Sequence, residues 1–514
     1  MMTTSGVTAG LPERSWSASP NEARVLPSLR ALFDSLRRAG VRYCHWKSNW
    51  RLRETLRGET DLDLLIHRGD ISQFLSVVGA LGYKPGSRED HPSVCHYYGF
   101  DQESGKLFDL HVYYRVITGG TIKGYHLPVE DMLLGGARQT EDGVYVPMRA
   151  AELVLFVIRK SLDYAVPSEA LIPRDRTAAA DELGWLRQGV DDQEVRGLLE
   201  EYLPSVEFAL FRSLTDAIES GRSGVARFRL CRALASRLRP HRRFAGGSAS
   251  LARGRRAWRK AWRTLRGGTP TQALLSGGAV IGVVGADGSG KSTVVREVSR
   301  WLGDFVSVAT IHGGKPPPSV ATALPRLLLP LLRRAMPGWR TSRIDVQAAE
   351  GNGAGPGATR GRRRLFYALR ALMLAYDRKR LLLGAHRKAM DGTLVIADRH
   401  PTRQPGVPEG PSLHFLRDDP NPLYRWLARA EERTYLAIPR PDLVFYLEVP
   451  LELAEHRNLT REKRGGPEPT DYLRLRHARS SELDFAGVPT HRIRTDAMVE
   501  ETLRSIKPIL WKAL

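Results

Sequence analysis

Cysteine is scarce in this chain, which has only Cys44, Cys95 and Cys231 among its 514 residues. No two of them lie at the short spacing of a metal-binding pair, and an odd, sparse set argues against a disulfide framework. Residues 1–25 also lack the basic start and apolar core of a signal peptide, and we expect them to form a disordered lead. These absences indicate a reducing compartment and predict a cytoplasmic protein.

Long hydrophobic runs are missing as well. The longest apolar stretches, such as residues 279–286, fall far short of the roughly 18–20 residues that span a bilayer. We therefore expect no transmembrane segment. The balance of 42% hydrophobic and 26% charged residues is that of a folded globular protein, which excludes a wholly disordered chain.

Acidic residues are too few to balance the basic ones, and the net charge is +22. No acidic residue occurs at 220–286, whereas 15 Arg or Lys residues occur at 222–266. We predict a basic linker at 226–275, in which RGRRAWRKAWRTL forms a basic helix with Trp258 and Trp262 one turn apart. Such a helix could contact an anionic membrane or another polyanion, or it could be a solvated linker docked on the protein itself.

What the chain does contain is a phosphate-binding sequence at residues 285–292, GADGSGKS, which fits the pattern G-x-x-x-x-G-K-[ST] of a P-loop. A short apolar run at 279–284 precedes it and an amphipathic stretch at 293–302 follows, which predicts strand, loop and helix. Glycines let backbone N–H groups surround phosphate, the lysine neutralises the β- and γ-phosphates, and the next hydroxyl is placed to bind Mg²⁺. The residues expected to bind ATP are Gly285, Asp287, Gly288, Ser289, Gly290, Lys291, Ser292 and Thr293.

Four stretches of this C-terminal part, in the right order, resemble the thymidylate kinase family. They are the P-loop with its internal Asp287, LAYDR at 374–378, LVIADRH at 394–400 and PDLVFYLEV at 441–449. The resemblance covers residues 279–514 and implies transfer of the γ-phosphate of ATP to a nucleoside monophosphate, with Mg²⁺ as cofactor.

The same resemblance implies roles for single residues. The implied acceptor-binding residues are Asp287, Arg378, Asp398 and Arg399. The implied ligands of Mg²⁺ are Ser292 and Asp398. The residues implied to stabilise the transferred phosphate are Lys291, Arg399 and the basic residues of a mobile lid, Arg457, Arg461, Lys463 and Arg464. Positive charge around a spread-out transition state is what phosphoryl transfer requires.

Two departures from the family concern the acceptor. His400 stands where the family has the tyrosine of Asp-Arg-Tyr, and residues 401–416 replace the segment that follows in the family. The acceptor could therefore be another nucleotide, a sugar phosphate or an unrelated compound.

Near the N-terminus, two carboxylates lie in an apolar run, TDLDLLI at 60–66. The alternation of side chains along a strand puts Asp61 and Asp63 on one face. A third acid is expected on a neighbouring strand, and Asp109 in LFDLHVY at 107–113 supplies it. Three such carboxylates can hold Mg²⁺ for in-line attack on a nucleotide α-phosphate.

Residues 28–125 resemble the nucleotidyltransferase superfamily of the DNA polymerase β type. That family has a Gly-Ser turn before its paired acids, and here HWKSN keeps Ser48 but has Lys47 in place of glycine. The resemblance implies that this turn forms a second nucleotide site, where Lys47 could itself hold a phosphate. The histidines show no metal-ligand spacing and are interpreted singly as structural, except that His111 beside Asp109 could touch the metal site.

Together these patterns predict an α/β multidomain protein. The expected parts are the disordered lead at 1–25, an α+β nucleotidyltransferase-like sheet at 26–125, a helical companion at 126–225, the basic linker at 226–275, and a P-loop kinase domain at 276–514 with a parallel sheet and helices on both faces. The predicted function is an ATP-dependent phosphotransferase, with nucleotidyl transfer as a second hypothesis. Fusions of this kind resemble genes of surface-polysaccharide assembly, by analogy alone. Two alternatives stay open: an ATP-binding regulatory or scaffold protein, and an enzyme that modifies nucleic acid held by the basic stretch.

Overall fold

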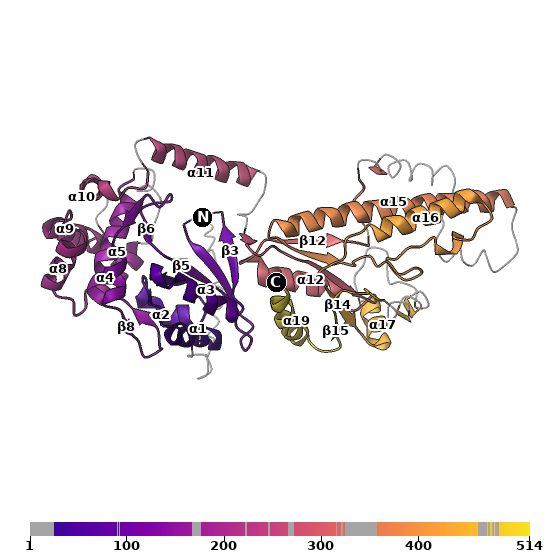
Figure 1. Cartoon of the computed structure of the whole chain (residues 1–514), viewed down its shortest axis with the longest axis horizontal. Helices are drawn as coiled ribbons and strands as arrows, with labels where there is room; N and C mark the ends of the chain where they lie inside the picture. Colours follow the sequence, from indigo (N-terminus) through magenta and orange to yellow (C-terminus); the bar gives the residue numbers. More distant parts are fainter. Residues whose placement is uncertain are drawn as a thin grey trace, which may run out of the picture.

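The molecule is elongated and contains two sheets, each covered by helices, one in its N-terminal part and one in its C-terminal part (Figure 1). This computed structural model describes residues 25–89, 91, 93–166, 176–221, 224–244, 247–265, 272–314, 316–319, 322–323, 357–460, 470, 473–474, 477–478 and 483–514. One sheet is mixed and the other is wholly parallel, so the predicted α/β class is confirmed. The disordered lead predicted at 1–25 lies outside the described residues, apart from residue 25.

Six strands in the order β1-β2-β5-β4-β3-β10 form the N-terminal sheet. Their bounds are Tyr43–His45 (β1), Leu62–Ile66 (β2), Leu107–Tyr113 (β5), Cys95–Phe100 (β4), Lys84–Arg88 (β3) and Gln272–Leu274 (β10). β2 and β5 are parallel, and the other neighbouring pairs are antiparallel. The two strands predicted to carry carboxylates are thus confirmed as neighbours. Every residue of both is buried, which explains their nearly continuous apolar sequences.

One face of this sheet is covered by α1 (Pro27–Arg38) and α3 (Ile71–Ala80). The buried residues of α1 recur at helical spacing and form one apolar stripe, Leu29, Leu32, Phe33 and Leu36. This stripe packs against Leu62 and Leu64 of β2. Because successive side chains of a strand alternate between faces, Asp63 points to the opposite face.

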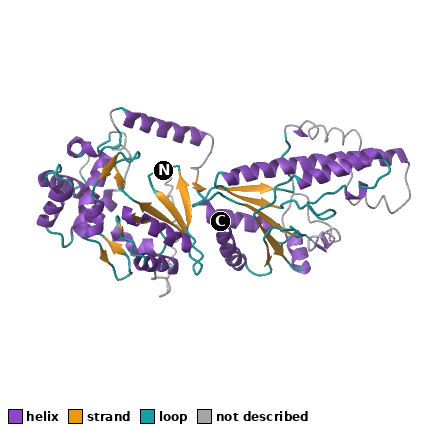
Figure 2. Ribbon diagram, viewed as in Figure 1, coloured by secondary structure: helices purple, strands orange, loops and turns teal. Residues whose placement is uncertain are grey.

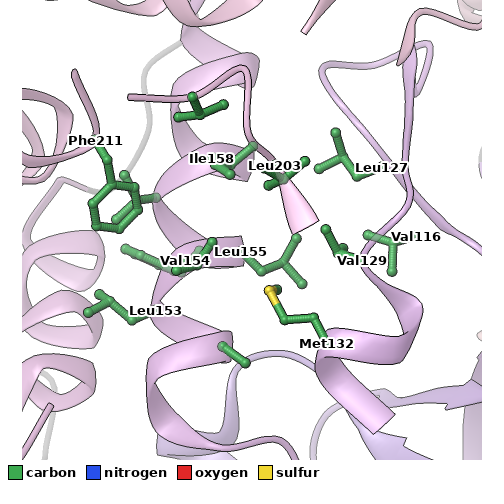
Figure 3. Packing of buried hydrophobic residues seen from close by; sticks show 14 of the residues in the cluster. Val116, Leu127, Val129, Met132, Leu153, Val154, Leu155, Ile158, Leu203 and Phe211 are labelled. Atoms are coloured by element: carbon green, nitrogen blue, oxygen red, sulfur yellow. The ribbon is translucent and has the colours of Figure 1, made fainter. Parts of the chain in front are cut away.

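That opposite face carries a helical layer built around α5 (Arg149–Tyr164). Figure 3 shows Leu155 and Ile158 of α5 among side chains of neighbouring elements, Met132 and Leu203 included. The other helices of the layer are α4 (Glu130–Gly135), α7 (Arg176–Arg187), α8 (Asp192–Tyr202), α9 (Phe208–Glu219) and α10 (Val225–Arg237). The linker was predicted to begin at residue 226, but buried side chains of α10 belong to this core, so the layer continues past that point.

Short elements complete the N-terminal part. They are helix α2 (Leu52–Leu56), the hairpin of β6 (Val116–Thr118) and β7 (Tyr125–Leu127), the hairpin of β8 (Arg138–Gln139) and β9 (Tyr145–Val146), and single helical turns at Asn49–Arg51, Arg68–Asp70 and Arg239–His241.

The predicted basic helix is confirmed as α11 (Ser248–Leu265), which has no buried residue. It runs above the N-terminal part (Figure 1), where its arginines bond to Thr121 and Glu89, the latter at 3.2 Å. The rings of Trp258 and Trp262 stack 5.9 Å apart, and these residues are 68% and 47% exposed. None of the described helices combines the length and the apolar character needed to cross a membrane.

Five parallel strands in the order β12-β13-β11-β14-β15 form the C-terminal sheet. Their bounds are Val308–His312 (β12), Leu394–Asp398 (β13), Val280–Gly285 (β11), Leu443–Glu448 (β14) and Thr490–Arg494 (β15). The strand predicted at 279–284 is confirmed as β11, which lies in the middle of the sheet. The stretches at 394–400 and 441–449, which resemble the thymidylate kinase family, contain its two neighbours, β13 and β14.

Helices cover both faces of this parallel sheet, as predicted (Figure 2). One face carries α12 (Lys291–Gly303) and α19 (Val499–Ala513), and the other carries α15 (Gly357–Met390) and α16 (Pro422–Leu436). After β14 follows α17 (Leu451–Thr460), and a helical turn at His414–Leu416 precedes α16.

Strand β10 connects the two sheets. It lies just before the P-loop strand in the chain but pairs with β3, with Gln272 opposite Arg88. Its backbone also bonds to the C-terminal part: the N–H of Ser307 donates to Gln272 O at 2.7 Å, and the N–H of Leu274 donates to Gly392 O at 3.0 Å. The segment predicted as a linker therefore ends in a strand that both parts share.

Aromatic side chains pack at the same junction. The ring of Phe100 in β4 lies 5.4 Å from that of Trp301 in α12 and 6.0 Å from that of Trp511 in α19. The indole N–H of Trp301 donates to Gly105 O at 3.2 Å. Tyr98 of β4 belongs to the same apolar core as α12. The two parts therefore share a packed interface.

Candidate functional site

The P-loop lies between the end of β11 and the start of α12, where the sequence predicted it. Gly285 and Gly288 have positive φ angles of +142° and +87°. A Cβ at Gly285 would collide with the carbonyl oxygen of Leu447, and one at Gly288 would come within 3.0 Å of Ala454 O. Both positions therefore require glycine, and the loop can curl so that its N–H groups and the N-terminus of α12 face a phosphate.

Lys291 is the first residue of α12 and is only 6% exposed. Its ammonium group donates to the carbonyl oxygens of Gly285 at 3.1 Å and Ala286 at 2.6 Å, so it lies within the curl of the loop. Burial, together with the nearby charge of Arg399, lowers the pKa of Lys291 to about 8. A buried cation that bonds to two carbonyl oxygens is well placed to receive phosphate oxygens.

The affinity for ATP is expected to fall as pH rises above about 8. The pKa of Lys291 is lowered to about 8 in the free protein, so its charge is present below that pH and is lost above it. Phosphates favour the charged form, so the dissociation constant should rise by up to about tenfold per pH unit in the alkaline range. Equilibrium ATP binding at pH 7 to 9.5 measures this. In Lys291→Ala, binding should be weaker and independent of pH, and an equally steep pH dependence in that variant would contradict the assignment.

Ser292 and Asp398 come together beside Lys291. Asp398 ends β13 next to β11, and the Ser292 hydroxyl donates to its Oδ2 at 3.1 Å. Within the described part of the chain, the buried Oδ1 of Asp398 has no hydrogen-bond partner. A hydroxyl and a carboxylate with a spare buried oxygen suit Mg²⁺, which prefers oxygen ligands. These two residues therefore fit the ion that the sequence predicted for them.

Arg399 joins the P-loop to the loop after β13. Its backbone is left-handed, with φ of +66°, a conformation that costs a non-glycine residue about 1 kcal/mol or more. Its guanidinium pairs with Asp287 of the P-loop and, at 3.2 Å, with Glu409. Glu409 was not among the residues predicted from the sequence, because it lies among prolines and glycines with no motif around it. The pairing brings two predicted acceptor-binding residues, Asp287 and Arg399, into direct contact.

Arg378 of α15 is only 5% exposed. Its guanidinium donates to Gly313 O at 3.0 Å, to Glu409 O at 3.3 Å and to the hydroxyl of Tyr435. Glu409 thus contacts both predicted acceptor arginines, through its side chain and its backbone. These three bonds use Nε and Nη1 of the guanidinium.

His400, the residue in place of the family's tyrosine, is 3% exposed. Burial lowers its pKa to about 4, so the ring is neutral near pH 7, and its Nδ1 donates to Pro401 O at 2.8 Å. It lines a cavity of about 400 Å³ together with Tyr435 and Phe485.

Of the predicted lid, Arg457 lies in α17. It donates to Gly288 O at 3.2 Å and to Thr495 O at 2.8 Å, so one basic side chain reaches the P-loop itself. The remaining lid residues, Arg461, Lys463 and Arg464, lie outside the described residues.

In the N-terminal part, the three predicted carboxylates surround His111. The parallel register pairs Asp63 of β2 with His111 of β5. Nε2 of His111 lies 3.3 Å from Asp109 and 3.6 Å from Asp61, and its Nδ1 lies 3.5 Å from Asp63. Burial alone would lower the pKa of His111, but Asp109 and Asp63 outweigh it and raise the pKa to about 9. Asp61 differs from the strand expectation, because it precedes β2 and its side chain is 56% exposed.

Lys47 is paired with one of these carboxylates. Its ammonium lies 2.7 Å from Asp63, and the two side chains are 19% and 12% exposed. Burial by itself would raise the pKa of Asp63, but Lys47 and His111 hold it far below its usual range. The positive charge of Lys47, which was predicted to hold a phosphate, is therefore balanced by the carboxylate of Asp63.

Ser48 lies at the turn after Lys47, with φ of +59°. The turn is held by Glu152 of α5, whose carboxylate accepts the backbone N–H of Asn49 at 3.0 Å and its side-chain amide at 2.9 Å. Burial raises the pKa of Glu152 to about 7. Sequence analysis missed this residue, although a lone acid in the apolar run AAELVLFVI was a signal.

Three of the histidines, which were interpreted singly as structural, lie together in the structure. One nitrogen each of His91, His96 and His111 lies within 4.8 Å of the other two. Sequence spacing could not indicate this, because the antiparallel pairing of β4 and β5 brings His96 opposite His111.

No protein-family model matches the chain, and no curated protein matches it either. Among solved structures, a deoxyadenosine kinase from M. mycoides with bound dATP is 17% identical, with a TM-score of 0.28, over 45% of this chain and 98% of that chain. A thymidylate kinase from Candida albicans is 16% identical, with a TM-score of 0.28, over 46% of this chain and 91% of that chain. Both neighbours are nucleoside or nucleotide kinases, and their likeness to this chain is distant.

Proposed function

We propose that the C-terminal part, residues 276–514, transfers the γ-phosphate of Mg·ATP to a nucleoside monophosphate or a similar phosphate-bearing acceptor. The observation that carries this proposal is the assembly at the end of β11. There Lys291 lies inside the P-loop, Ser292 bonds to Asp398, and Arg399 pairs with Asp287. This arrangement supplies phosphate binding, an oxygen pair for Mg²⁺ and positive charge within one loop cluster.

In the proposed reaction, an oxygen of the acceptor phosphate attacks the γ-phosphorus while its bond to the β–γ bridging oxygen breaks, and ADP leaves. Lys291 and the loop N–H groups hold the β- and γ-phosphates. Ser292 and Asp398 would hold Mg²⁺, which neutralises developing charge on the phosphates. Arg399 and Arg378 would bind the acceptor phosphate, and Arg457 would hold the P-loop from the side of the lid.

The test uses purified full-length protein with Mg²⁺ and ATP labelled at the γ-phosphate. Nucleoside monophosphates, sugar phosphates and RNA are offered separately as acceptors. Transfer of label to a monophosphate or a sugar phosphate supports the proposal and names the acceptor. Tight ATP binding with only slow hydrolysis, and no transfer to any acceptor, rejects it in favour of an ATP-binding regulatory protein.

Nucleotidyl transfer in the N-terminal part is a second candidate, favoured by one observation. Asp61, Asp63 and Asp109 converge on the same imidazole. Such a group could hold Mg²⁺ for attack on an α-phosphate. Incorporation of α-label from ATP, lost in Asp109→Asn and retained in Lys291→Ala, would support this activity, and its absence from every acceptor would reject it.

We further propose that α11 contacts an anionic lipid surface. Its basic residues have no acidic neighbours in the helix, and Trp258 and Trp262 are exposed side by side. The double variant Trp258→Ala/Trp262→Ala should bind vesicles rich in anionic lipid about tenfold more weakly in a sedimentation assay. Trp426→Ala, an exposed tryptophan on α16, is the matched control. Binding to RNA but not to vesicles would refute the proposal.

A further inference from the structure

Three imidazoles gather on the polar face of the N-terminal sheet. His96 of β4 and His111 of β5 are directly opposite in the antiparallel register, with ring centroids 4.8 Å apart. His91, in the turn before β4, places its ring 5.9 Å from that of His96 and 5.8 Å from that of His111. One nitrogen from each ring lies within 4.8 Å of the other two.

Asp109 fixes the orientation of the most buried ring. Nδ1 of His96 lies 2.8 Å from Asp109 Oδ2, and both side chains are at most 2% exposed. Because the carboxylate accepts a proton from Nδ1, the lone pair of His96 is on Nε2. In the described structure that buried Nε2 has no hydrogen-bond partner. A carboxylate that orients an imidazole, with the other nitrogen left open, is the arrangement found around metal-binding histidines.

We propose that His91, His96 and His111 bind a divalent transition-metal ion of the zinc class, with Asp109 as the positioning carboxylate. Three nitrogens leave one position of a tetrahedral ion open for a water molecule or for a carboxylate. Asp61 is an exposed candidate for that position, since an oxygen of Asp61, one of Asp109 and a nitrogen of His111 also lie within 4.8 Å of one another.

The donor set favours such an ion over Mg²⁺. Imidazole suits zinc, cobalt, copper and nickel, whereas Mg²⁺ prefers oxygen ligands and near-octahedral geometry. One of the three carboxylates, Asp63, is already paired with Lys47 at 2.7 Å. The nitrogen-rich side of the cluster is therefore the better site, and the proposal does not depend on the kinase function.

The test measures metal binding by the full chain, not activity. Protein stripped with a chelator is titrated with Co²⁺, whose visible absorption is intense in four-coordinate sites, and Zn²⁺ is then added in competition. One equivalent of Co²⁺ should give this spectrum, and Zn²⁺ should abolish it. His96→Ala and His91→Ala should each remove it, and Asp109→Asn should weaken binding by about 10–100-fold.

His126→Ala is the matched control, because His126 is a partly exposed histidine paired with Glu130 outside the cluster. It should bind Co²⁺ as the parent chain does. His91 is only partly buried, so His91→Ala should fold even if His96→Ala does not. No spectrum from the parent chain, or the same spectrum from folded His91→Ala, overturns the proposal. Either result leaves the proposed γ-phosphate transfer untouched, because that reaction is assayed separately.

Discussion

Lys291→Ala is expected to reduce γ-phosphate transfer by at least about 10²–10³-fold, the loss that follows removal of one preorganised charge or donor from a transition state. Lys291 is 6% exposed, and among the described residues its ammonium bonds to the loop carbonyl oxygens of Gly285 and Ala286. When ATP binds, the ammonium can exchange those carbonyls for phosphate oxygens without moving far. Alanine at this position would remove the positive charge but should not change the conformation of the loop, which its glycines determine.

The measurement is initial-rate transfer from γ-labelled ATP to whichever acceptor the panel identifies. Lys388→Ala is the control, because this exposed lysine lies in the last turn of α15, on an element remote in sequence from the P-loop. It should change the rate by less than twofold. Lys291→Arg should not restore the rate, because the planar guanidinium cannot replace a compact buried point charge. Activity in Lys291→Ala within tenfold of the parent would refute the assigned role.

Asp63→Ala is expected to destabilise the N-terminal part by about 3 kcal/mol, since removing one partner of a buried ion pair leaves the other charge uncompensated. That charge is Lys47, which lies 2.7 Å from Asp63 and 5.2 Å from the rings of both Trp46 and Tyr113. Burial lowers the pKa of Lys47, and the nearby positive charge of Arg159 lowers it further. Without Asp63, the positive charges of Lys47 and Arg159 would therefore lie close together in a partly buried site.

Thermal unfolding monitored by tryptophan fluorescence measures this effect. The double variant Lys47→Met/Asp63→Leu should recover most of the lost stability, because a buried pair can often be replaced by apolar side chains of similar size. Since the pKa of Asp63 is lowered on folding, its stabilising contribution is present above the unfolded pKa near 4 and is lost as pH falls below it. The parent and Asp63→Ala should therefore differ at pH 7 and converge in strong acid. Equal melting temperatures at pH 7 would show that Lys47 does not need this partner.

Local patterns predicted the elements whose signals are local. The P-loop and the strands β2, β5 and β11 each follow from an apolar run or a glycine motif within a few residues, whereas β13 and β14 lie in stretches marked only by their resemblance to the thymidylate kinase family. We expected β2 and β5 to be neighbours because carboxylates that hold one Mg²⁺ site must lie close together. This expectation also grouped Asp61, Asp63 and Asp109. The assigned roles of these residues remain predictions.

What the sequence could not predict depends on pairing between distant segments. The histidine cluster requires the register that places His96 opposite His111, and a shift of one residue would turn both rings to the other face. The hydrogen bonds between Glu152 and Asn49 connect residues that are 103 positions apart in the sequence. Glu409 contacts Arg399 and Arg378 only because a proline-rich loop folds back, and no periodicity encodes that path. Registers and loop paths come from tertiary packing, which a single sequence does not display.

The position of β10 bears on how this molecule could be divided. Its three residues lie at the end of the segment predicted as a linker, and they complete the edge of the N-terminal sheet beside β3. A cut on its N-terminal side would leave β3 with bare N–H and C=O groups, and a cut on its C-terminal side would strip Ser307 and Gly392 of their partners. Bare edges of this kind recruit strands from other copies and cause aggregation. Each half alone is therefore expected to aggregate. The two proposed activities must accordingly be synthesised, degraded and localised together, as one chain.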